Sequence, residues 1–266
     1  MQHMIEQPVM VKICDILEES PGVKTFFFKL NPNYEPGQFV MVWIPLLDEK
    51  PFTLSYMQEG LLGISVLRRG AFTKALHSKK TGDMIGIRGP YGRGFNLHVH
   101  SDICAVGGGI GMASLATLVD RLNLASEKRQ GTTTIIQGAR TSAEILYQKR
   151  FKNMKLCTDD GTAGFKGTTV DLLKDLLTKQ RFRKVYACGP ERMLYKVVEL
   201  CKEHGIECEV SLERYIKCGF GVCGQCDCSG QRVCIDGPVF NGEELSKMDD
   251  FGKITVTKTG ERVIHP

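Results

Sequence analysis

The spacing of hydrophobic residues changes near residue 102, and this change constrains the fold more than any other feature of the sequence. Before it, short segments rich in β-branched and aromatic residues are separated by turn signals; they are "KTFFFKL", "GQFVMVWI", "PFTLSYM", "LLGISVL" and "DMIGIRG". Closely spaced strands of this kind are typical of a small antiparallel barrel. One short helix is expected within it, over residues 73–78, after a turn at Gly70.

From residue 102 onward, strand-like and helix-like segments alternate. The expected strands are "ICAV", "TTTIIQ", "MKLCTDD", "KVYACG" and "ECEVSL", and the expected helices cover residues 111–123, 143–151, 169–180 and 191–204. This alternation predicts a parallel sheet with helices on both faces. A cysteine-rich segment follows, and "GKITVTKTGERVI" near the end of the chain is expected to form a hairpin.

The length of 266 residues is enough for two ordinary domains, or one large one, with a sizeable core. We predict a barrel over residues 1–100, an α/β domain over 101–212, and a C-terminal cysteine segment with the hairpin over 213–266. The net charge of +5 contains no long run of Lys or Arg, which favours a solvated surface over a nucleic-acid-binding one. The start of the sequence lacks the pattern of a signal peptide, and the longest apolar run is interrupted by three consecutive glycines. We therefore expect a soluble, cytoplasmic protein with neither nucleic acid nor membrane as a partner.

Five of the eleven cysteines are clustered in a glycine-rich stretch. Cys218, Cys223 and Cys226 form a C-x4-C-x2-C array, and Cys228 and Cys234 follow. Glycine and polar neighbours leave little for these thiols to pack against, and disulfides are disfavoured in a reducing cytosol. Clustered cysteines in such a compartment are usually metal ligands.

The spacing of the clustered cysteines favours an iron–sulfur site over zinc. Zinc sites usually use two separate C-x2-C pairs, whereas x4 and x2 gaps in one loop are the plant-type spacing of a [2Fe–2S] cluster. The intervening glycines would let backbone N–H groups turn towards the sulfurs. Cys228 lies only two residues beyond Cys226, whereas Cys234 sits at the far end of a probable turn, "SGQR", and can return to the cluster, so we predict Cys234 as the fourth ligand.

Two strand ends in the α/β domain are candidate nucleotide-binding turns. The first, "CAVGGGIGMASL", allows close backbone approach at Gly107, Gly108, Gly109 and Gly111, and a helix N-terminus follows that attracts phosphate. The second, "YACGPERM", places Cys188, Gly189 and Pro190 at the same sheet edge. The first turn departs from G-x-G-x-x-G, so an ordinary strand–turn–helix junction is the alternative. Together the two turns favour NAD as a ligand.

A nicotinamide and an iron–sulfur cluster in one chain require an intermediary, because the first exchanges a hydride and the second exchanges single electrons. A flavin is the usual intermediary, and we predict that the barrel binds FAD. Two barrel segments, "KPFTLS" and "VLRRGAFT", are the candidates, with ordinary barrel structure as the alternative for each. Their predicted cofactor-binding residues are Lys50, Pro51, Phe52, Thr53, Leu54 and Ser55, and Val66, Leu67, Arg68, Gly70, Ala71, Phe72 and Thr73. No side chain is predicted to be catalytic.

These motifs, in this order, resemble the ferredoxin–NADP reductase superfamily over nearly the whole chain. "KPFTLS" resembles that family's R-P-[IF]-[ST]-[IL] flavin motif, and "GPYGRGF", "GGGIGMASL", "TDDGTAGFKG" and "YACGPERML" resemble its further turns. The cysteine segment with its ending "VCIDGPVF" is similar to the electron-transfer subunits of the dihydroorotate dehydrogenases that use NAD. This ending independently supports Cys234 as the fourth ligand.

The resemblance implies a function within a larger complex. A partner subunit with its own FMN would oxidise dihydroorotate to orotate in pyrimidine biosynthesis, and the two subunits would form a heterotetramer. Electrons would pass through the cluster and FAD to NAD+. Two positions depart from the family: Lys50 replaces an arginine, for which Arg68 or Arg69 are the possible substitutes, and Ser114 replaces a proline at a helix start.

Three other functions fit the same motifs. The same architecture serves NAD(P)H:ferredoxin oxidoreductases, sulfide dehydrogenases and the diaphorase subunits of hydrogenases. A redox sensor that uses cluster and flavin without turnover is a non-enzymatic alternative. A flavoprotein with a structural zinc site is the third.

Overall fold

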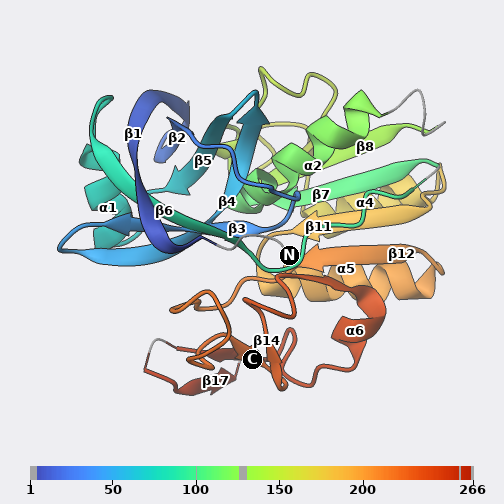
Figure 1. Ribbon diagram of the computed structural model, residues 1–266. Helices are drawn as coiled ribbons and strands as arrows, with labels where there is room; N and C mark the ends of the chain where they lie inside the picture. Colours follow the sequence, from blue (N-terminus) through green and yellow to red (C-terminus); the bar gives the residue numbers. More distant parts are fainter. Residues whose placement is uncertain (1–4, 100, 126–130, 258, 265–266) are drawn as a thin grey trace.

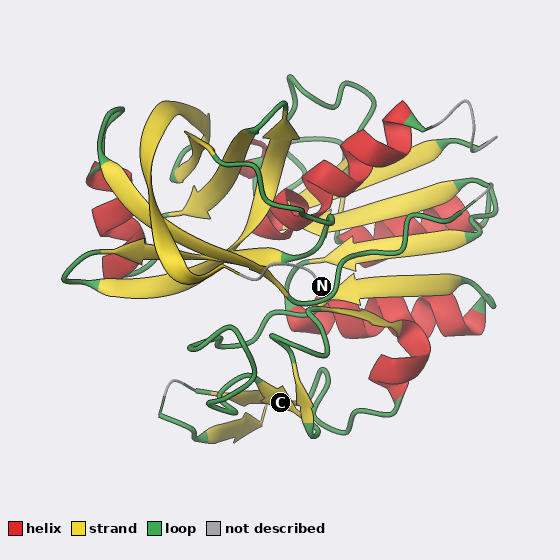
Figure 2. Cartoon of the chain, in the orientation of Figure 1, coloured by secondary structure: helices red, strands yellow, loops and turns green. Residues whose placement is uncertain are grey.

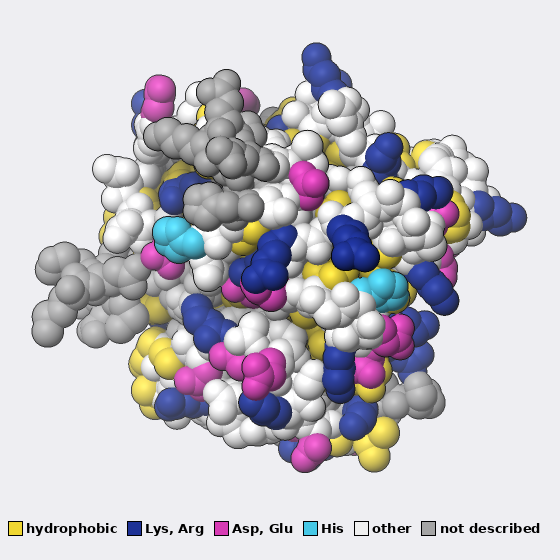
Figure 3. Space-filling view, turned by 90° about the vertical axis from the view of Figure 1, so that its right-hand side faces the viewer, with side chains coloured by type: hydrophobic (Ala, Val, Ile, Leu, Met, Phe, Trp, Pro, Cys, Tyr) yellow, Lys and Arg dark blue, Asp and Glu magenta, His cyan; other side chains and the backbone are white. Residues whose placement is uncertain are grey.

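The computed structural model describes residues 5–99, 101–125, 131–257 and 259–264. A β-barrel lies beside an open sheet with helices, and the C-terminal segment packs below both (Figures 1 and 2). No helix in these described ranges is both long and apolar enough to cross a membrane. On the face seen in Figure 3, Lys and Arg side chains are interspersed with Asp and Glu.

Six antiparallel strands close the barrel in the order β1-β2-β5-β4-β3-β6. They are β1 (Ile5–Ser20), β2 (Val23–Lys29), β3 (Phe39–Ile44), β4 (Asp48–Gln58), β5 (Leu61–Leu67) and β6 (Met84–Tyr91). The expected short helix is confirmed as α1 (Ala71–Ser78), which buries Phe72 and Leu76 against the barrel core. Strand β1 was not expected from the sequence, and it closes the barrel by pairing with both β2 and β6.

The open sheet has seven strands in the order β10-β9-β8-β7-β11-β12-β15. They are β7 (Ile103–Gly108), β8 (Thr133–Ala139), β9 (Lys155–Thr158), β10 (Phe165–Lys166), β11 (Lys184–Cys188), β12 (Glu207–Ser211) and β15 (Val239–Asn241). All pairs are parallel except β12 with β15. The predicted parallel sheet is therefore confirmed, with one antiparallel edge strand added by the C-terminal segment.

Both faces of the sheet are covered by helices, as predicted. Helix α2 (Met112–Leu124) packs with Ile103 and Ala105 of β7 on one face. Cys104 and Val106, the alternate residues of β7, face the core formed with α4 (Thr169–Leu177) and α5 (Glu191–Glu203). The alternation of side chains along a strand accounts for this division, and burial on both faces accounts for the nearly continuous apolar sequence of β7.

The prediction of a helix at residues 143–151 is wrong. The segment contains only the short 3-10 turn η2 (Ser142–Glu144) and then an irregular path. Tyr147 has a φ of 56°, which no α-helix contains, and its hydroxyl donates to Ser65 Oγ of the barrel at 2.7 Å. Leu146, Tyr147 and Phe151 of this segment are buried in the core beside α2. Packing against neighbouring elements has overridden local helix preference here.

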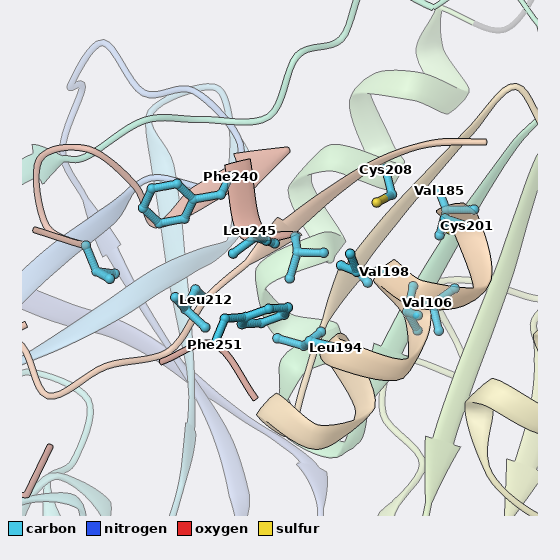
Figure 4. Packing of buried hydrophobic residues seen from close by; sticks show 14 of the residues in the cluster. Val106, Val185, Leu194, Val198, Cys201, Cys208, Leu212, Phe240, Leu245 and Phe251 are labelled. Atoms are coloured by element: carbon cyan, nitrogen blue, oxygen red, sulfur yellow. The ribbon is translucent and has the colours of Figure 1, made fainter. Parts of the chain in front are cut away.

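The C-terminal segment is joined to the sheet by a shared core. It contains β13 (Asp227–Cys228), β14 (Gln231–Arg232), α6 (Gly242–Ser246) and the expected hairpin, which is confirmed as β16 (Ile254–Val256) with β17 (Arg262–Ile264). Phe240, Leu245 and Phe251 of this segment lie in one cluster with Leu194 and Val198 of α5 (Figure 4). The segment therefore packs against the α/β part of the chain through a common hydrophobic core.

Candidate functional site

The four predicted cluster ligands lie in two pairs. Cys218 hydrogen-bonds to the Cys223 side chain, and Cys226 hydrogen-bonds to the Cys234 side chain. Cys234 also lies close enough to Cys218 for the two thiols to interact electrostatically. Cys223 is exposed whereas Cys226 and Cys234 are buried, so the group of thiols extends from the core to the surface.

Backbone amides in the cysteine loop point at these sulfurs. Burial raises the pKa of Cys218, but backbone N–H groups, first that of Cys223, outweigh it and lower the pKa to about 7. For Cys226, the hydrogen bond with the Cys234 thiol lowers the pKa to about 6, and the Cys234 amide adds to this at 3.4 Å from Cys226 Sγ. At Cys218 and Cys226 the loop therefore favours the thiolate, the form in which cysteine binds metals, whereas the hydrogen bond with Cys226 and burial raise the pKa of Cys234.

Left-handed backbone makes this amide arrangement possible. Gly219, Gly221 and Gly224 have φ values of 85°, 82° and 68°. A Cβ on Gly221 would lie 2.6 Å from Ile235 Cγ1, so a side chain there would displace the turn that carries Cys234. All three glycines are therefore favoured by their left-handed conformation, and Gly221 is required by space as well.

The described residues contain no group of three His, Cys, Asp or Glu side chains placed to hold one metal ion. Two pairs of thiols are a different arrangement, with two ligands available for each of two metal atoms. Cys228 takes no part in it. Its sulfur accepts a hydrogen bond from Arg214 Nη2 at 3.2 Å and lies near Glu191 and Asp250.

Arg214 is a residue that the sequence did not single out. Its side chain is 1% exposed, and it pairs with Glu191 at the start of α5 while also donating to the carbonyl of Ile254. Glu191 follows the predicted nucleotide turn directly, and Cys228 lies two residues after Cys226. Arg214 therefore ties the cysteine segment to the sheet edge that carries the predicted nucleotide turn.

Replacing Arg214 with methionine is expected to destabilise the protein by about 3 kcal/mol, because it leaves the Glu191 carboxylate without its buried cation. Denaturant unfolding under anaerobic conditions would measure this loss. Arg183→Met is the matched control, since the Arg183–Glu207 pair has 64% and 57% exposed side chains and should contribute less than about 1 kcal/mol. Equal losses for the two variants would contradict the role given to Arg214.

The structure brings the two predicted nucleotide turns together. Cys188 at the end of β11 pairs with Gly107 at the end of β7, so both turns lie at the same sheet edge. A Cβ on Gly111 would lie 2.4 Å from the Cys188 carbonyl oxygen, and a Cβ on Gly189 would lie 3.0 Å from Gly108 Cα. The two turns therefore pack backbone against backbone, and Gly109, with a φ of 53° and nothing near its Cβ position, lies open to solvent or ligand.

The first flavin segment lies beside these turns. Ser114 of α2 donates to Thr53 Oγ1 of β4 at 3.1 Å, and Ser114 also hydrogen-bonds to Cys188. Burial raises the pKa of Cys188 to about 11, so this residue stays a thiol. Ser114 thus links β4, the predicted flavin strand, to the second predicted nucleotide turn.

Not every residue of the two flavin segments has its side chain free for a ligand. Leu54 and Val66 are fully buried in the barrel core, and Ser55 Oγ is bound to Ser65 Oγ at 2.7 Å and to the Gly63 carbonyl. These three residues can offer only backbone groups. Leu67, which follows Val66, is partly buried and packs against the core beside α2.

Several of the other predicted flavin residues lie at or near the start of α1. Phe52 stacks on Phe72 with ring centroids 6.1 Å apart, which joins the two segments, and Pro51 lies beside Phe52 in β4. Gly70 caps α1, where Thr73 Oγ1 accepts from the Gly70 amide at 3.0 Å, and Arg68, Gly70 and Ala71 are exposed. Lys50 is directed elsewhere: it pairs with Asp48 at 2.5 Å and lies 5.4 Å from the ring centroid of Tyr215.

A family model for the iron–sulfur cluster binding domain of dihydroorotate dehydrogenase B matches residues 213–246. A protein of Methanocaldococcus jannaschii, described as "Probable dihydroorotate dehydrogenase B (NAD(+)), electron transfer subunit", is 44% identical over 98% of this chain and 100% of its own length. One of Methanothermobacter thermautotrophicus with the same description is 43% identical over 96% of this chain and 97% of its own.

Among solved structures, an NADH-dependent reduced ferredoxin-NADP oxidoreductase superimposes with a TM-score of 0.81 and 28% identity, covering 91% of this chain and 90% of that one. The fold expected from the resemblance is thereby confirmed. The identity to the archaeal proteins is high, and it extends over essentially the full length of both chains. The chain belongs to the family of electron transfer subunits of dihydroorotate dehydrogenase B (NAD(+)).

Proposed function

We propose that the chain is the electron-transfer subunit of an NAD-linked dihydroorotate dehydrogenase and works with an FMN-containing catalytic subunit in a heterotetramer. The observation that supports this most directly is the two thiol pairs, Cys218 with Cys223 and Cys226 with Cys234, in a segment that matches the family's cluster domain. When bound, a [2Fe–2S] cluster supplies single-electron transfer, FAD exchanges single electrons for pairs, and NAD+ takes up a hydride.

The four thiols fit a [2Fe–2S] cluster because each iron needs two ligands, and in each pair one thiol, Cys218 or Cys226, has its thiolate stabilised by backbone amides. The cysteine loop also lies against the barrel: a Cβ on Gly219 would meet Met41 of β3 and Tyr91 of β6. The segment that holds the cluster would therefore contact the strands of the flavin domain directly.

The proposed roles of the other residues follow from their positions. In the barrel, Thr53 would offer its hydroxyl to the flavin ring, and the exposed start of α1 at Gly70 would receive the pyrophosphate. At the sheet edge, the turns at residues 107–111 and 188–190 would hold NAD, with Gly109 as the open position. The positions of these residues also support our proposed division of the chain into three units, residues 1–100, 101–212 and 213–266.

The surface around the cysteine loop suits contact with a partner subunit. Phe220 is 45% exposed and Val222 is 78% exposed, and both lie beside the exposed Cys223. Ile235, next to Cys234, is 40% exposed. Exposed apolar side chains commonly mark protein interfaces, and these three lie within residues 220–235, the stretch that also carries the exposed Cys223.

The experiment that tests this function is reconstitution with the FMN-containing subunit encoded by the same organism. The complex is expected to reduce NAD+ with dihydroorotate, whereas the isolated chain should oxidise NADH only with an artificial acceptor. A second candidate, an NAD(P)H:ferredoxin oxidoreductase, is supported by the structural similarity to such an enzyme. Reduction of ferredoxin without any response to dihydroorotate would favour that candidate, and absence of NADH oxidation with every acceptor would favour a redox sensor.

A further inference from the structure

We propose that Arg88 and Glu49 form a charge pair in the barrel that fixes the cysteine loop and sets the reduction potential of its cluster. This inference rests on the proposed function, since it assumes a cluster at Cys218, Cys223, Cys226 and Cys234. Neither Arg88 nor Glu49 belongs to a motif that links the sequence to its family. Both come from the barrel, far from the cysteines along the chain.

Each of the three nitrogens of the Arg88 guanidinium donates at least one hydrogen bond. Its Nε and Nη2 donate to the two carboxylate oxygens of Glu49 at 2.6 and 2.5 Å, and its Nη1 donates to the Tyr91 hydroxyl at 3.0 Å. Nη2 also donates to the carbonyl oxygen of Cys218 at 2.7 Å. The side chain is 8% exposed, so this charge is held in one place and is only weakly screened by water.

Arg88 also contacts the loop beyond Cys218. Its guanidinium carbon lies 5.5 Å from the ring centroid of Phe220. Gly219, which lies between Cys218 and Phe220 in the chain, packs on Met41 of the barrel. Three successive residues of the cysteine loop are thus fixed by β3 and β6. A two-pronged ion pair with Glu49 prevents Arg88 from moving away with the loop.

The charges have opposite effects on the energy of an added electron. Reduction makes the cluster more negative, so the nearby positive charge of Arg88 stabilises the reduced form, and the negative charge of Glu49 destabilises it. Removing Arg88 alone should lower the reduction potential, and removing Glu49 alone should raise it. A residue with a merely structural role would not produce two shifts of opposite sign.

The test is an EPR-monitored redox titration of the anaerobically purified full chain with bound cofactors. Arg88→Gln is expected to lower the equilibrium constant for cluster reduction about tenfold, which is about 59 mV for one electron, and Glu49→Gln to raise it by a similar factor. The double variant should return close to the unmodified protein. Arg88→Lys keeps the charge and should shift the potential far less than Arg88→Gln.

Arg183→Gln is the control, because this exposed arginine pairs with Glu207 and should leave the potential unchanged. Shifts of the same sign in Arg88→Gln and Glu49→Gln, or no shift in either, would overturn the inference. Iron and sulfide are measured in every variant. A full complement of both with unchanged potentials rejects the charge-pair role alone, whereas absence of both from the unmodified chain rejects the proposed function.

Discussion

Replacing Cys223 with serine is expected to abolish iron–sulfur absorption and to reduce dihydroorotate-dependent NAD+ reduction by the complex to background. Cys223 pairs with Cys218 through its side chain and its amide, so the change removes one ligand and alters its neighbour. The nucleotide turns and the flavin strand lie outside this loop, so NADH should still reduce the bound FAD. Absorption spectra and stopped-flow reduction by NADH would measure the two effects separately.

Cys228→Ser is the matched control for this substitution. It lies in the same segment, but its sulfur contacts Arg214 instead of the paired thiols. Iron content and electron transfer should therefore remain, with a loss of stability as the main effect. Loss of iron from Cys228→Ser, or loss of NADH–flavin chemistry from a folded Cys223→Ser, would contradict the assignment of ligands.

Replacing Gly111 with alanine is expected to reduce kcat/KM for NADH at least about tenfold while leaving the cluster signal intact. The backbone of Gly111 has ordinary helical angles, so the effect is not conformational. The added Cβ would lie 2.4 Å from the carbonyl oxygen of Cys188, and backbone atoms can yield only by separating the two turns. A misplacement of about 1 Å in a positioning element can lower the rate on the order of 100-fold. Steady-state kinetics with an artificial acceptor would measure the change.

Two other glycines provide controls for Gly111→Ala. At Gly108 the added Cβ would meet side chains, the Met193 sulfur at 2.6 Å and Pro190 Cδ at 2.9 Å, instead of a backbone carbonyl, so Gly108→Ala should have a smaller effect than Gly111→Ala. Gly205 follows α5 with a φ of 64° and nothing near its Cβ position. Gly205→Ala should cost about 1 kcal/mol of stability without changing KM for NADH. If Gly205→Ala impaired NADH oxidation as much as Gly111→Ala, the effect would be one of stability.

The sequence predicted those helices and strands in which the order of apolar and polar residues matches the order of buried and exposed residues. The buried residues of β7 alternate between two helical layers, and the sequence there is continuously apolar. The helix prediction for residues 143–151 failed because contacts of Tyr147 with the barrel and with the core beside α2 determine the path of this segment. No local sequence pattern contains that information. Strand β15 has only three residues, and its place at the sheet edge depends on pairing with β12.

The site was predictable where spacing along the chain determines geometry. The x4 and x2 gaps and the glycines identified the cysteine loop, since these features act over a few residues. Arg88 and Arg214 were not predictable, because their partners lie in distant segments: Arg88 is 130 positions from Cys218. No signal in the sequence distinguishes these two arginines from the exposed ones, and only the fold brings them to the thiols.

Iron and acid-labile sulfide analysis of the anaerobically purified chain, with EPR of the reduced protein, tests the central claim most directly. We predict two irons and two sulfides per chain and the rhombic signal of a reduced [2Fe–2S] cluster. Zinc in place of iron, or metal without sulfide, would contradict the claim that these cysteines hold an electron-transferring cluster.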